Sequence, residues 1–246
     1  MVKKEKKIEY SIGNIINSLN NILNDPGKIS SLLKKEDIKT YTYTYEKFID
    51  HFEELRKKDK EEWLVIGSSI VYSWMPTILN IAGRDPEAVA QEIGVPFDIR
   101  KQEIKEDAIE GLNNISKNLD GESLEKDLKK LKLFINNSVV GMSKFLHFSF
   151  PDHYPIWDSR VESVLYETAT GKTTKSNYHR LKIINNYMEY RTSCLALKKN
   201  IKHKNDLKNI LNKYDELENM YDGLELGNVS DLRKIEFLLF LKGGKK

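Results

Sequence analysis

Apolar residues recur along much of the chain at spacings of three and four positions, which is the period of an amphipathic α-helix. The first such stripe covers residues 12–23 and ends before Asp25-Pro26-Gly27, a sequence that closes helices. The same period predicts helices over residues 45–55, 63–81, 104–115, 124–135, 178–197, 207–217 and 235–241. Only residues 40–44 alternate in the manner of a strand, and they suggest a short extended entry to the helix that follows. The pattern predicts an all-α fold.

The predicted helices follow one another without an internal repeat or a low-complexity linker. At 246 residues the chain is long enough to bury a sizeable core, and 39% hydrophobic with 31% charged residues is typical of a globular protein. We therefore expect a single domain over residues 1–246, organised as one helical unit or as two helical lobes around a cleft.

Charge and cysteine content limit the kinds of ligand site that we expect in this chain. The 40 basic and 37 acidic residues nearly cancel to a net charge of +3, so a partner rich in phosphates must be held by locally concentrated charge. One cysteine, Cys194, excludes an intramolecular disulfide and a site of several thiolates. The five histidines lack ligand spacing, so we predict neither a metal nor another cofactor.

Targeting signals are not predicted either. The first residues are charged, and no long apolar segment follows them as in a signal peptide. The longest apolar run, over residues 64–75, is too short to span a bilayer. A soluble, cytoplasmic protein without a membrane partner is the expectation.

The most informative stretch is residues 136–167. We predict a helix that ends near Asn137, a short turn that contains Gly141, and a new helix from about Met142. Two prolines then force an extended passage. Asp158 stands immediately before the next helix.

This order of elements resembles the helix-hairpin-helix DNA glycosylase superfamily. The likeness lies near residues 130–167, and the text from Ser143 to Val161 is similar to a group of 8-oxoguanine-glycosylase-like bacterial proteins. In that superfamily a glycine-bearing hairpin precedes a helix that carries a catalytic lysine in many members, and an aspartate begins a later helix. The resemblance implies Asp158 as the essential carboxylate and Lys144 as a candidate nucleophile.

The resemblance also implies an activity, namely excision of a damaged or modified base in DNA repair, with or without AP lyase activity. Amide groups at a helix start bind a phosphate of double-stranded DNA without a basic side chain. A fixed carboxylate stabilises the positive charge that develops on the sugar, and a deprotonated lysine attacks the sugar carbon. The target base is extruded into a pocket lined by stacking groups.

Particular residues are implied for these roles. The DNA contacts would be Val139, Val140, Gly141, Ser143 and Arg160. The aromatic lining of the base pocket would be Trp157, Trp74 and Tyr72.

The same residues admit a purely structural interpretation. Asp158 suits a helix N-cap, and Ser159 with Glu162 has the spacing of a capping box. The tryptophans and Tyr72 suit a core, as does His147 on the apolar face of its helix. Two other functions therefore stay open: a DNA-binding module that has lost chemistry, and a helical interaction protein, for example in phage defence.

Two further signals concern phosphate. Gly171-Lys172-Thr173 fails as a phosphate loop, because the earlier glycine that such a loop requires would fall at Tyr166, and Gly171 suits the end of a helix instead. Basic residues after it, such as Arg180, suit either a DNA backbone or a solvated face. Lysines 198, 199, 202, 204 and 208 form a denser basic run, partly offset by Asp206.

Overall fold

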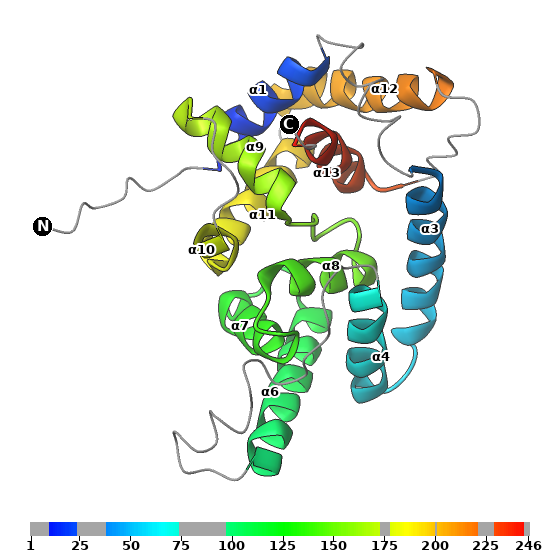
Figure 1. Cartoon of the computed structure of the whole chain (residues 1–246), viewed down its shortest axis with the longest axis vertical. Coiled ribbons are helices and arrows are strands. Elements are labelled where there is room, and N and C mark those ends of the chain that lie inside the picture. Colours follow the sequence, from blue (N-terminus) through cyan, green and yellow to red (C-terminus); the bar gives the residue numbers. More distant parts are fainter. Residues whose placement is uncertain are drawn as a thin grey trace, which may run out of the picture. The chain divides into compact units, whose positions relative to one another are not determined.

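The computed structural model describes residues 10–23, 38–73, 97–172, 178–199, 201–220 and 229–243 (Figure 1). Within these ranges the regular elements are helices and no β-strand occurs, which confirms the all-α prediction. The chain divides into two compact units, one of residues 44–156 and one that combines residues 1–43 with 157–246. We call them the central unit and the terminal unit. In the part of the chain that is described, no helix is long and apolar enough to cross a membrane.

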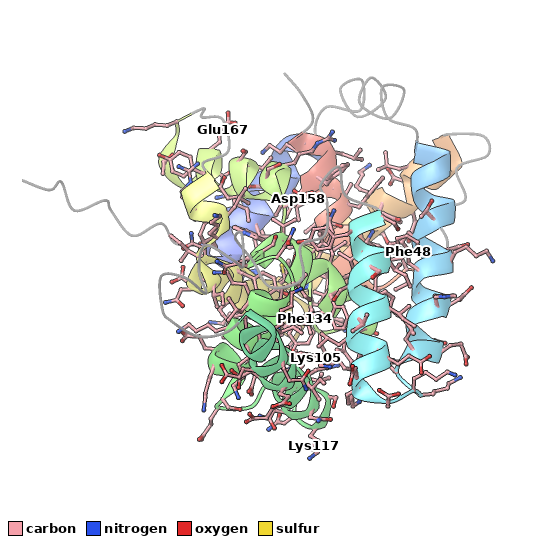
Figure 2. All side chains as sticks on the ribbon, turned by 60° about the horizontal axis from the view of Figure 1, so that its bottom comes forward. Phe48, Lys105, Lys117, Phe134, Asp158 and Glu167 are labelled. Atoms are coloured by element: carbon pink, nitrogen blue, oxygen red, sulfur yellow. The ribbon has the colours of Figure 1, made fainter. Side chains whose placement is uncertain are left out.

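The central unit contains five described helices. They are α3 (Ile38–Leu55), which belongs to this unit from Thr44 onward, α4 (Lys60–Ser73), α6 (Phe97–Lys117), α7 (Leu124–Phe134) and α8 (Val139–Ser149). Helix α6 packs along α7 and α4, and α8 packs on both α4 and α7. The last residue of α7, Phe134, is buried and is labelled in Figure 2.

An aromatic cluster forms the core of the central unit. Phe52, Trp63, Phe145 and Phe148 are each at most 1% exposed. Phe145 of α8 stacks on Trp63 of α4 with ring centroids 6.0 Å apart, and it meets Phe52 of α3 edge-on at 5.5 Å. These contacts fix the apolar face of α8 against two neighbouring helices.

The terminal unit is built from segments at both ends of the chain. Its helices are α1 (Ile12–Leu23), α9 (Ser159–Thr170), α10 (Tyr178–Leu181), α11 (Ile184–Lys199), the 3₁₀ turn η1 (Ile201–His203), α12 (Lys204–Met220) and α13 (Asp231–Lys242). Helix α1 packs on α9, α11, α12 and α13, and α9 also packs on α13.

Most predicted helices are confirmed, but two predictions are wrong. The continuous helix expected over residues 178–197 is interrupted at residues 182 and 183, between α10 and α11. The strand-like stretch at residues 40–44 lies inside α3, so the expected extended segment is wrong. Ile38, Tyr41, Tyr45 and Phe48 follow the helical spacing of three and four, and this longer period prevails over the local alternation. Gly171 ends α9 in the left-handed conformation with φ of 67°, as predicted. The expected helix over residues 63–81 is described only to Ser73.

Candidate functional site

The hairpin of the predicted motif joins α7 to α8 through two asparagines. Asn136 and Asn137 both have positive φ angles, of 57° and 49°, a conformation that asparagine tolerates better than most residues. Ser138 then caps α8, and its hydroxyl accepts a hydrogen bond from the Gly141 amide at 3.0 Å. The predicted turn at Gly141 and helix start at Met142 are therefore wrong, since the asparagines reverse the chain before Ser138.

Gly141 has a packing role in the first turn of α8. A Cβ atom on it would lie 2.9 Å from Cγ2 of Ile135 and 3.0 Å from Oη of Tyr72. Tyr72 is 5% exposed and packs beneath the hairpin. Tyr72, which was predicted either to line the base pocket or to belong to the core, is therefore a core residue.

The predicted DNA contacts of α8 fall into two groups. The amides of Val139 and Val140 lie in the first turn, where a helix offers no internal acceptor, and neither donates a hydrogen bond within the described residues. In contrast, the Val139 side chain and Ser143 are buried, and the Ser143 hydroxyl donates to the Val140 carbonyl at 2.9 Å. The backbone of this turn, and not its side chains, is the part suited to a ligand.

Asp158 is the N-cap of α9, and its side chain is partly exposed (Figure 2). One carboxyl oxygen, Oδ1, accepts hydrogen bonds from the amides of Arg160 and Val161, both at 2.9 Å. The other oxygen, Oδ2, has no hydrogen-bond partner among the described residues. The two amide bonds fix the carboxyl group, and the N-cap interpretation is confirmed.

The alternative capping box of Ser159 and Glu162 does not form. Glu162 is fully buried and accepts a hydrogen bond from Nε of Arg180 instead. The Arg180 guanidinium lies 3.8 Å from the centre of the Tyr166 ring, and its side chain is only 14% exposed. Arg180 is therefore an internal ion-pair partner, and its interpretation as part of a solvated face is wrong.

Trp157 is a core residue of the terminal unit. It is fully buried, and its Nε1 donates to the Leu181 carbonyl at 3.3 Å. Tyr10 and Tyr190 pack on it, with ring centroids 5.4 and 5.3 Å away. In this arrangement Trp157 offers no free face to an extruded base. Trp74 lies outside the described residues.

Lys144 and Arg160 occupy the two units separately. Lys144 is half-buried on α8 of the central unit. Arg160 is half-buried on α9 of the terminal unit, and its guanidinium lies 4.2 Å from the centre of the Phe240 ring. The same boundary separates Lys144 from Asp158, because it falls between Ile156 and Trp157.

A buried histidine supports the loop that follows α8. Nδ1 of His147 lies 2.7 Å from the Tyr154 carbonyl, and its Nε2 lies 2.8 Å from Oη of Tyr45. Because a carbonyl only accepts, Nδ1 carries the proton and Nε2 of the neutral ring accepts from the tyrosine. The prediction of a core histidine is confirmed. Its partner Tyr45, 102 positions away, has no signal in the sequence.

No protein-family model, curated protein or solved structure matches the chain. Within the described ranges, no three histidine, cysteine, aspartate or glutamate side chains gather as a metal site requires. The chemistry that the motif offers is therefore a fixed carboxyl group, a half-buried lysine and the amides of a helix hairpin.

Proposed function

We propose that this protein is a DNA N-glycosylase that excises a damaged or modified base, with Asp158 as the essential carboxylate. The observation that carries the proposal is the geometry of that carboxyl group. Two backbone amides hold one oxygen at 2.9 Å, while the other is partnerless within the described residues. A group so fixed can act on a reacting centre without reorganising first.

The hairpin supports DNA as the partner. Its tight turn at Asn136 and Asn137 leads directly into α8, whose first amides, on Val139 and Val140, point out of the helix start. Such amides, together with the helix dipole, favour a phosphate group. Backbone amides hold DNA without reading its sequence, which suits a chain of nearly balanced charge.

The carboxylate suits bond cleavage at the sugar. When the N-glycosidic bond breaks, the base leaves with the bonding electrons and positive charge develops on the sugar. The charge of Asp158 would stabilise that transition state and would orient the attacking group. Lys144 is the candidate amine nucleophile. Its attack on the sugar carbon would give a Schiff base that sodium borohydride traps as a covalent protein–DNA adduct.

The test compares wild type with Asp158→Asn and Asp158→Ala on duplexes that carry assorted lesions and modified bases. Asparagine retains a side-chain oxygen for the amides of Arg160 and Val161, so the helix cap survives and only the charge is lost. We expect base release to fall by about 100-fold or more with no change in melting temperature. Asp158→Ala should also lose about 1 kcal/mol of stability.

Two outcomes would contradict the proposal. Equal base release by wild type and Asp158→Asn would remove this carboxyl group from the mechanism. No abasic product from any duplex would exclude base excision for the set of bases tested. If Lys144→Gln still releases the base and is still trapped by borohydride, Lys144 is excluded as the nucleophile. The proposed role of Asp158 would not be affected by that result.

A second candidate function is a DNA-binding module without chemistry. It is favoured by the full burial of Trp157 and by the structural role of Asp158 as a cap. It predicts salt-dependent DNA binding that changes at the hairpin weaken, with no abasic product. Failure to bind DNA at low salt would favour the third candidate, a helical interaction protein.

A further inference from the structure

The positive charge of the chain is concentrated where α11 passes into α12. Residues 198–208 contain five lysines and one aspartate, a net charge of +4. The whole chain carries +3, so the other 235 residues sum to −1. We call Lys198, Lys199, Lys202, Lys204 and Lys208 the lysine patch. All of it belongs to the terminal unit.

Several lysines elsewhere in the structure lie beside carboxylates. Lys57 lies 2.6 Å from Glu54, and Lys129 lies 2.6 Å from Glu125. In the patch, Lys199, Lys204 and Lys208 are exposed and form no ion pair with any described residue. The one acid among residues 198–208 is Asp206, and its Oδ2 lies 3.1 Å from Nδ1 of His203. Lys199, Lys204 and Lys208 therefore present charge to solvent that no described carboxylate neutralises.

Helix stability does not explain this arrangement. Lys198 and Lys199 end α11, where positive charge suits the helix dipole. Lys204, in contrast, begins α12, and Lys208 follows one turn later on the same face. Positive charge near a helix N-terminus opposes the dipole. Asp206 in the same turn offsets part of this effect, but neither Lys204 nor Lys208 has an ion-pair partner among the described residues.

We propose that the lysine patch binds the phosphate backbone of duplex DNA. Regularly spaced phosphates would neutralise Lys199, Lys204 and Lys208, and the release of counterions from the DNA would favour the contact. An anionic membrane is less suited, because surface-bound helices also insert apolar side chains. Among the described residues the exposed large apolar side chains are Ile66 and Ile183, and neither lies in the patch. The inference shares its partner with the proposed function but requires no base excision.

The experiment measures binding of the full chain to a fluorescein-labelled, lesion-free duplex of about 30 base pairs between 50 and 200 mM NaCl. The test variant is Lys199→Gln/Lys204→Gln/Lys208→Gln. The control removes the same charge from Lys47, Lys57 and Lys58, which lie near Asp50, Glu54 and Glu62. Each lost phosphate contact lowers the slope of log K against log[salt] by about 0.9, so the test variant should lose about 2.7. Wild-type affinity should then fall about 40-fold more across this range than that of the variant.

The expected result is a reduced slope and weaker binding in the test variant, with the control near wild type. Equal slopes in both triple variants would overturn the proposal, as would no binding by wild type at 50 mM salt. Loss of binding to phosphatidylserine vesicles without loss of DNA binding would also overturn it, in favour of a membrane. Binding to the lesion-free duplex and base release from lesion duplexes are measured separately, so failure of the excision chemistry and failure of the patch are distinguished.

Discussion

Gly67 offers the clearest test of how α8, the second helix of the hairpin, is held in place. It is buried on α4, and a Cβ atom on it would lie 2.7 Å from Cε2 of Phe145 and 3.1 Å from the Phe52 ring. Carbon atoms in contact normally lie about 3.5–4.0 Å apart, so at least one ring must move by nearly 1 Å. Both rings are fully buried, and Phe145 is also stacked on Trp63.

The magnitude of Gly67→Ala follows from two opposing effects. Overpacking a core costs about 1–3 kcal/mol, whereas replacing glycine by alanine inside a helix gains up to about 1 kcal/mol. We therefore expect a net loss of about 1 kcal/mol. Gly13→Ala is the matched control, because Gly13 is exposed in α1 and the nearest atom to its added Cβ is 3.9 Å away. That variant should gain stability.

Urea unfolding followed by circular dichroism at 222 nm measures both variants. Both substitutions add a methyl group to a helical glycine, so the difference between them mainly reports the packing cost at Gly67, about 1–3 kcal/mol. A double variant, Gly67→Ala with Phe145→Leu, should lose less than the sum of its single changes, since the smaller side chain makes room. Equal stabilisation by alanine at both glycines would refute this account of the core.

Two further predictions concern buried polar groups. Tyr45→Phe removes the hydroxyl that donates to His147 and should cost about 1 kcal/mol in the same unfolding assay; an unchanged midpoint would contradict the assigned bond. Burial raises the pKa of Cys194, Tyr10 and Tyr190 in the folded state, so each keeps its proton to higher pH than in the unfolded chain. The free energy of unfolding should therefore be constant below the unfolded pKa values, about 8.5 for cysteine and about 10 for tyrosine. Above them it should fall by about 1.4 kcal/mol per pH unit for each group. A free energy that does not change from pH 8 to 11 would exclude this linkage.

The hydrophobic periodicity predicted most of the helices correctly, because the helices of this protein bury apolar residues at regular spacings of three and four. Ile15 and Leu19 of α1, for example, are fully buried and lie four positions apart. The failure at residues 40–44 arose where two periods coincide, since a Thr-Tyr alternation lies within a longer helical spacing. A window of five residues cannot separate these patterns, whereas the stripe that continues to Phe52 does.

The hairpin was located correctly, but its turn was assigned to the wrong residues. The turn was predicted to contain Gly141, whereas Asn136 and Asn137, both with positive φ, form it. The Asn-Asn-Ser sequence carried a usable signal, because asparagine tolerates positive φ and serine favours N-caps. The Arg180–Glu162 ion pair could not be predicted from the sequence, because residues 18 positions apart meet only through tertiary packing.

The two halves of the motif are anchored independently, and this allows DNA binding and chemistry to be separated by mutation. The loop after α8 is held within the central unit by the bond from His147 to the Tyr154 carbonyl. Asp158 follows Trp157, which is held within the terminal unit by its bond to the Leu181 carbonyl. A change at the hairpin, such as Ser138→Ala, therefore perturbs the cap of α8 without touching the carboxyl group. If the amides of Val139 and Val140 hold phosphate, that variant weakens binding to every duplex alike, whereas Asp158→Asn abolishes release from a duplex that is still bound. If Ser138→Ala and Asp158→Asn each lost both DNA binding and base release, the motif would act only as a structural element.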